Sequence, residues 1–110
     1  MHEAGLLAAA VADALAAAGP GQTRPTSIEI RIHDPIHVAP EAALMHAELA
    51  LRARGLVDVP LTVIADPVAC VACDAVNEVH ADHPFCDDCG WPLPDRGGHQ
   101  VDAVARWAAS

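Results

Sequence analysis

The stretch Cys70-Val-Ala-Cys73 is followed, after twelve residues, by Cys86-Asp-Asp-Cys89-Gly90, and together they hold all four cysteines of the chain. In a Cys-x-x-Cys turn both sulfurs can point at one centre, and two facing turns supply four thiolates, the donor set of a closed tetrahedral zinc site. Gly90 provides the permissive backbone that such a turn needs. Because the short gap suits a small zinc ribbon or zinc hairpin, the sequence predicts structural Zn²⁺ at Cys70, Cys73, Cys86 and Cys89.

Three other uses of the cysteines stay open at this point. Two disulfides would need an oxidising compartment, which the rest of the sequence does not indicate. A thioredoxin-like redox pair would need a βαβ context, which is not found around these residues. An iron site of the rubredoxin kind uses the same ligands, normally with a longer gap. Zinc is the preferred interpretation.

The chain of 110 residues is acidic and poor in aromatic side chains, with only Phe85, Trp91 and Trp107. Its length fits one domain, or one domain with a small metal-held appendage. The formal net charge of −9 argues against nucleic acid as a partner, because that binding needs a basic surface. An acidic chain with seven histidines suits a cation or a basic protein partner better.

Residues 6–18 are apolar enough to imitate a signal peptide, but two features argue against that interpretation. The preceding Met1-His2-Glu3 has no Lys or Arg, and Asp13 interrupts the run. The run is also too short to span a membrane. We therefore expect a cytoplasmic protein without membrane association, where reduced cysteines favour a metal over disulfides.

Two segments have the periodicity of amphipathic helices, residues 3–18 and residues 40–54. Gly19-Pro20-Gly21 ends the first, and Gly55 ends the second after a start at Pro40. The expected inner stripes are Leu7, Val11, Ala14, Leu15 and Ala18 in the first helix, and Leu44, Ala47 and Leu51 in the second.

Strands are predicted at residues 26–33 and 60–65, the first from the clear alternation of Ile28, Ile30 and Ile32 with polar residues. Residues 75–79 suggest a short strand between the cysteine pairs. Residues 101–107 fit either a strand or a helix, and we prefer a strand that returns to the sheet.

The order of these elements predicts an α+β fold, with two helices packed on a small three-stranded sheet and an inserted zinc-ribbon-like module of four cysteines. We expect residues 1–67 and 99–110 to form the α+β domain, and residues 68–98 to form the zinc-binding module.

The second stretch with chemical content is Met1-His2-Glu3. The α-amine, the following amide nitrogen and the imidazole of His2 can close adjacent chelate rings. Such planar nitrogen donors are characteristic of sites for Ni(II) and Cu(II). Spacing alone is a weak indication, since a histidine after the initiator methionine is usually inert.

The chain resembles the HypA/HybF family of nickel metallochaperones. The resemblance is carried by Met1-His2-Glu3 directly before an amphipathic helix, by a strand over residues 28–32 followed by Val38-Ala39-Pro40-Glu41-Ala42-Ala43-Leu44, and by the two cysteine pairs before a closing apolar strand. It covers nearly the whole chain. The combination of the N-terminal motif with the double cysteine pair is specific, whereas either half alone is weak.

The resemblance implies a non-enzymatic protein that binds Ni²⁺ at its N-terminus and delivers it for maturation of [NiFe] hydrogenase and, in some cells, urease. Nickel would be bound by His2, with Glu3 and the Met1 amine in support, while the cysteines hold structural zinc. The implied partners are a GTPase nickel metallochaperone and the hydrogenase large subunit. Apart from the resemblance, we expect the chain itself to be a monomer or a homodimer.

Some residues depart from the family pattern. His33 stands where the family usually has Gly after the first strand, and Ala39 stands where an acidic residue is often found. The roles of four loop histidines stay open: they are either solvated side chains, or they tune the metal sites or sense pH. These residues are His33, His37, His80 and His83.

Two other classes of function compete with nickel delivery. The alternative is a zinc-ribbon adaptor that binds only protein. An enzyme is disfavoured, because no Ser-His-Asp or nucleophilic Cys pattern occurs and four Cys ligands leave zinc no open position for water.

Overall fold

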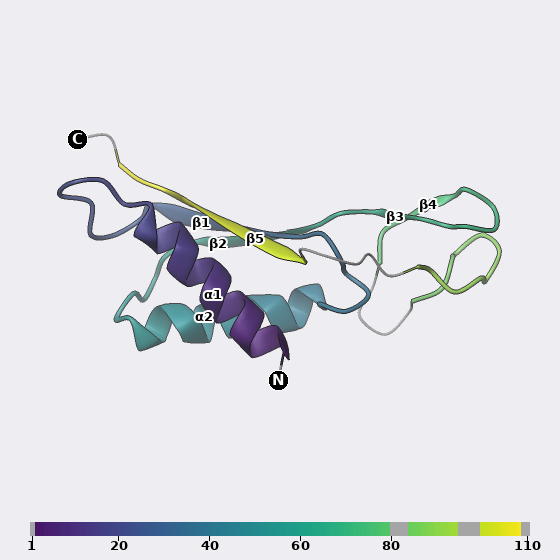
Figure 1. Ribbon diagram of the computed structural model, residues 1–110, viewed down its shortest axis with the longest axis horizontal. Coiled ribbons are helices and arrows are strands. Elements are labelled where there is room, and N and C mark those ends of the chain that lie inside the picture. Colours follow the sequence, from purple (N-terminus) through teal and green to yellow (C-terminus); the bar gives the residue numbers. More distant parts are fainter. Residues whose placement is uncertain (1, 80–83, 95–99, 109–110) are drawn as a thin grey trace.

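A computed structural model describes residues 2–79, 84–94 and 100–108 (Figure 1). Predictions that fall on Met1, His80, His83 and residues 95–98 therefore lie outside the described residues. The elements are α1 (His2–Ala16), β1 (Ser27–Ile32), α2 (Pro40–Ala53), β2 (Leu61–Ala65), β3 (Val68–Ala69), β4 (Val76–Asn77) and β5 (Val101–Arg106).

The main sheet is mixed and has the strand order β2-β1-β5. The central strand β1 runs parallel to β2, with Ile30 opposite Val63, and antiparallel to β5, with Ile30 opposite Ala103. The parallel pair is connected through α2, as a crossover between parallel strands requires. The α+β fold with two helices and three strands is confirmed, and the last segment is a strand as preferred.

Both helices lie on the same face of the sheet (Figure 1). The alternating isoleucines of β1 point into this layer, and Ile28, Ile30 and Ile32 are all buried. Leu7 and Val11 of α1 meet them as predicted. The packing follows from the period of two in the strand and about 3.6 in the helices, which gives each element one apolar side.

The first helix ends at Ala16, two residues before the predicted end. Two bonds tighten its last turn, from the N–H of Ala17 to the Ala14 oxygen and from the N–H of Ala18 to the Leu15 oxygen. Such bonds to the third preceding residue are usual where a helix ends. The predicted inner position of Ala18 therefore lies outside α1.

The prediction that Leu44 belongs to the inner stripe of α2 is wrong. The buried residues are Ala43, Ala47 and Leu51, whereas Leu44 is 37% exposed. Steps of four residues keep the buried side chains on one side of the helix. Leu44 lies about 60° around the helix from Ala47, the middle of this set, and therefore at its border with solvent. The helix thus packs its smallest side chains against the sheet and turns a leucine outwards.

The C-terminus of α2 is closed by a Schellman motif at Gly55. The N–H of Gly55 donates to the oxygen of Arg52, and the N–H of Leu56 donates to the oxygen of Leu51. Gly55 has a φ of +75°, a conformation that favours glycine. This cap directs the chain towards β2 at the edge of the sheet.

The four-cysteine segment extends the molecule along its long axis, giving extents of 51 × 28 × 23 Å (Figure 1). It has a small two-stranded sheet of β3 and β4, of which only β4 was predicted. Its own core consists of Val68, Cys70, Val79, Cys86 and Leu93. Ile36, from the turn after β1, packs against this second core and joins it to the rest of the molecule. Neither described helix is long and apolar enough to cross a membrane.

Candidate metal centre

The four cysteine sulfurs converge as the sequence predicts. All four Sγ atoms lie within 4.8 Å of one another. The Sγ atoms of Cys70 and Cys89 are 3.6 Å apart, as are those of Cys73 and Cys86. In a tetrahedral site with metal–sulfur bonds of about 2.3 Å, the sulfur atoms are about 3.8 Å apart. The observed separations therefore fit a single metal ion of the size of zinc. The set can therefore hold a metal ion such as zinc.

Each cysteine pair forms the same tight turn. The N–H of Asp74 donates to the oxygen of Cys70 at 3.0 Å, and the N–H of Gly90 donates to the oxygen of Cys86 at 2.9 Å. Both donors have left-handed backbones, with φ of 64° at Asp74 and 78° at Gly90. Gly90 was predicted for this role from the sequence. Asp74 was not, although Asp is one of the few non-glycine residues that adopts this conformation readily.

The similarity of the two turns extends to the residue after each donor. The N–H of Cys70 donates to the oxygen of Ala75, and the N–H of Cys86 donates to the oxygen of Trp91, both at 2.8 Å. Each turn is thus closed as a small hairpin that directs both of its sulfurs to one side. Two equivalent hairpins facing each other place two sulfurs on either side of one centre.

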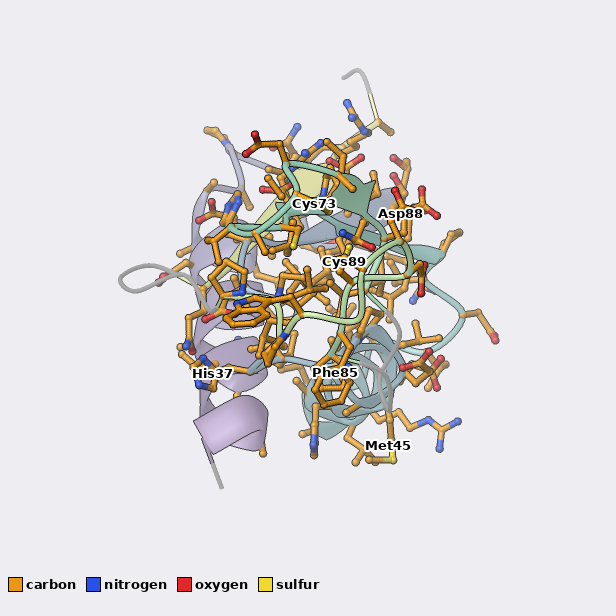
Figure 2. All side chains as sticks on the ribbon, turned by 90° about the vertical axis from the view of Figure 1, so that its right-hand side faces the viewer. His37, Met45, Cys73, Phe85, Asp88 and Cys89 are labelled. Atoms are coloured by element: carbon orange, nitrogen blue, oxygen red, sulfur yellow. The ribbon has the colours of Figure 1, made fainter. Side chains whose placement is uncertain are left out.

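Burial divides the ligands into an inner and an outer pair. Cys70 and Cys86 are only 1% and 2% exposed, whereas Cys73 and Cys89 are exposed. Cys73 and Cys89 lie at the end of the molecule that faces the viewer in Figure 2, with Asp88 nearby. A bound metal would therefore have its inner side against the second core and its outer side close to water.

Asn77 connects the two turns from the inside. Its Nδ2 donates to the oxygen of Ala75 at 3.1 Å and contacts the Sγ of Cys86 at 3.6 Å. Its Oδ1 accepts from the N–H of Asp87 at 2.9 Å. This buried amide was missed by the sequence analysis, although a lone Asn within an apolar strand between two cysteine pairs was visible.

Hydrogen bonds prepare one of the four sulfurs, that of Cys86, to act as a thiolate. The backbone of Cys89, followed by the backbone of Asp88 and the Asn77 amide, lowers the pKa of the Cys86 thiol to about 6. The Sγ of Cys70 also accepts from the N–H of Ala72 at 3.4 Å. Because a metal replaces the thiol protons, donors that favour the thiolate also favour metal binding.

The N-terminal nickel ligands stay a prediction. The backbone of His2 begins α1, but Met1 and the side chains of His2 and Glu3 lie outside what the structure describes. The structure therefore brings together the four cysteines and leaves the geometry of the second predicted site undescribed.

The histidines of the first turn are held by carboxylates. The Nδ1 of His37 lies 2.8 Å from Oδ2 of Asp34, which is buried, and the same oxygen lies 3.5 Å from the Gln100 amide. The two nitrogens of His33 meet Asp66 and Asp102. Neither histidine belongs to the sulfur cluster. His37 closes its own turn on Asp34, three residues away, whereas His33 ties together backbone segments that are distant in sequence.

No family model matches the sequence, and no curated protein matches it. The resemblance to nickel metallochaperones therefore depends on the residues quoted from this chain, and membership of that family stays a prediction.

Proposed function

We propose that the chain is a nickel metallochaperone that binds Ni²⁺ at its N-terminus and delivers it for maturation of [NiFe] hydrogenase or urease, with structural zinc on the four cysteines. The observation that carries this proposal is the start of α1 at His2, directly after Met1. The amide N–H groups of a first helical turn have no acceptor within the helix. An amide nitrogen at this position can therefore bind a metal without breaking a helical hydrogen bond.

The same position suits a site that must release its cargo. The N-terminus of a helix carries partial positive charge, which weakens the binding of a cation. The amine and imidazole of model compounds have pKa values near about 8 and about 6.5, so protons compete with nickel close to neutrality. Both effects favour exchangeable rather than permanent binding.

The cysteine site complements this role by supporting the fold. Four thiolates complete a tetrahedron, so a zinc ion held there has no open position for a substrate or a water nucleophile. Two of its ligands belong to the second hydrophobic core. We therefore assign zinc a structural role, and the protein a non-enzymatic one.

The proposed partners follow from the resemblance alone. They are a GTPase nickel metallochaperone and the large subunit of [NiFe] hydrogenase, which places the protein in the cytoplasm. The acidic chain, with a formal net charge of −9, is consistent with protein and cation partners and not with nucleic acid.

A nickel titration by calorimetry tests this function. The tightest binding event should disappear in His2→Ala and in a chain with extra residues before Met1, because both changes remove a nitrogen donor. His46→Gln, a histidine substitution within α2, serves as the matched control and should bind nickel as the parent does. If the first two variants also bind nickel like the parent, the N-terminal site is wrong.

A second function is favoured by the surface of the cysteine segment, which suits a zinc-ribbon adaptor that binds only protein. Four of its large apolar side chains are exposed: Val71, Val76, Phe85 and Trp91. Exposed aromatic residues often anchor protein interfaces. If the protein contains zinc, and if His2→Ala and the N-terminally extended chain bind nickel as the parent does, the result would favour the adaptor over the metallochaperone.

A further inference from the structure

The outward side of α2 combines apolar and charged side chains in a regular order. We call this surface the α2 stripe, and its members are Glu41, Leu44, Met45, Glu48, Leu49 and Arg52. Glu41, Met45, Glu48 and Arg52 follow at steps of four, three and four residues, which keeps them on one line along the helix. The two leucines flank that line, and all six side chains are exposed.

The apolar members of the stripe are well exposed to water. Met45 and Leu49 are 52% and 54% exposed, and Leu44 is 37% exposed. Figure 2 shows Met45 at the outer boundary of the molecule. The core of the fold is filled by the opposite side of α2, through Ala43, Ala47 and Leu51, so the stripe is not needed to close the chain on itself.

A groove adjoins the stripe along the side that faces β2. It has a volume of about 490 Å³, and Leu44 and Glu48 form part of its wall. Leu51, Leu56 and Val59 contribute apolar lining between the helix and the edge of the sheet. A side chain of a docked helix that lies beside Leu44 can therefore be buried without rearrangement of the fold.

The order of charges along the stripe makes it complementary to itself. Glu41 lies in the first turn of α2 and Arg52 in the last, roughly 16 Å apart along the axis. When two copies of α2 run antiparallel about a two-fold axis, Glu41 of each lies level with Arg52 of the other. Leu44 of each then lies level with Leu49 of the other, next to the groove.

From this complementarity we propose that the α2 stripe docks a second copy of this chain, as an antiparallel two-fold helix pair. The parallel arrangement is disfavoured, because it places Glu41 against Glu41 and Arg52 against Arg52. A two-fold interface uses the same patch on both copies, so every favourable pair occurs twice. The proposal does not depend on nickel binding.

The charge pairs decide the orientation, and the apolar side chains supply most of the attraction. Exposed ion pairs contribute about 0–1 kcal/mol each, whereas burial of leucine and methionine side chains contributes more. The contact comprises a single short helix and its groove from each copy, so the interface is at the small end of specific interfaces. We therefore expect a weak, concentration-dependent dimer.

Sedimentation equilibrium of the zinc-loaded full chain tests the pairing through charge reversal. The parent should shift with rising concentration from 11.4 kDa towards twice that mass. Glu41→Arg and Arg52→Glu should each stay monomeric to at least tenfold higher concentration, because each places like charges opposite one another. An equimolar mixture of the two variants should dimerise again, since the mixed pair has opposite charges at both ends.

Asp13→Arg is the matched control, because it makes the same charge change on the exposed surface of α1 and should leave dimerisation intact. Circular dichroism checks that each variant is folded, and the mixture uses the same two proteins, so its recovery cannot result from a change in folding. A parent that remains at 11.4 kDa, single variants that dimerise like the parent, or a mixture that stays monomeric would each overturn the proposal.

Discussion

The imidazole of His33 joins the carboxylate of Asp66 where the sheet meets the metal-binding segment, with Nδ1 2.8 Å from Oδ2. Its other nitrogen, Nε2, lies 2.7 Å from Oδ2 of Asp102, and Arg31 reaches Oδ1 of Asp66 at 3.1 Å. His33 follows β1, Asp66 follows β2 and Asp102 lies in β5. One side chain therefore ties together the ends of all three strands.

We predict that this contact makes stability depend on pH. The hydrogen bond to Asp66, followed by that to Asp102, raises the pKa of His33 above 6.5. Stability from a raised histidine pKa is fully present below about pH 6.5 and is lost as the pH rises through the raised value. The difference in free energy of unfolding between the parent and His33→Gln should therefore be largest near pH 6 and shrink towards pH 9, by about 1 kcal/mol at most because the pair is partly exposed.

Urea unfolding of zinc-loaded protein at several pH values measures this difference. Asp102→Asn keeps the contact with Asp66 and should show a smaller pH-dependent loss than His33→Gln. A difference that stays constant from pH 6 to pH 9 would show that His33 stabilises the strand ends by packing and not by its charge.

The cysteine cluster predicts one tightly bound zinc per chain after purification under reducing conditions. Elemental analysis checks the stoichiometry, and a colourless solution distinguishes zinc from iron. Removal of the metal with a chelator should lower the melting temperature, because metal ligation replaces much of the hydrophobic core in so small a segment. Protein that contains no metal after this purification would contradict the site.

The division between a structural and a transported metal can be tested with two variants. Cys73→Ser removes one ligand of a closed site and should lower the melting temperature clearly, whereas His2→Ala should change it little. Differential scanning calorimetry without added nickel makes the comparison. Equal destabilisation by both substitutions would contradict the separation of the two roles.

The parts of the fold that the sequence predicted are those with a strong local pattern. Alternation over Ile28, Ile30 and Ile32 identified the central strand, and two pairs of cysteines identified the metal centre. The orientation of α2 was harder to predict, because Leu44 and Ala43 lie on neighbouring sides of a helix rich in small apolar residues. The packing of α2 against the sheet and α1, which places Ala43 inwards, is a tertiary feature that no local pattern of the helix shows.

Long-range polar contacts could not be predicted from the sequence, for a different reason. Asp66 and Asp102 lie 33 and 69 residues from His33, and their meeting depends on the strand order β2-β1-β5. No local spacing encodes that order. The amide of Asn77 is similar, because its contact with Cys86 exists only once both cysteine turns face each other.

Asn77 is not one of the four metal ligands, yet we expect it to matter for metal retention. Asn77→Ala removes the amide that bonds the N–H of Asp87 and contacts the Sγ of Cys86, of which Cys86 is buried and Asp87 exposed, at a cost of about 1 kcal/mol. Transfer of zinc to a chromogenic chelator should therefore be faster. Glu78→Gln, at the exposed neighbouring position, is the control and should release zinc at the parental rate.

The two cysteine turns predict opposite effects of substitution at their equivalent left-handed positions, Asp74 and Gly90. Asp74→Gly removes the steric cost of a φ of 64° and should raise the free energy of unfolding by up to about 1 kcal/mol. Gly90→Val should destabilise strongly, because a β-branched residue strains a φ of 78°. Gly90→Asp should be milder than Gly90→Val, since the other turn already accommodates Asp at the equivalent position.

Thermal unfolding of the zinc-loaded variants ranks their stabilities. A loss of stability in Asp74→Gly would show that the Asp74 carboxylate stabilises the turn by more than its left-handed backbone conformation destabilises it.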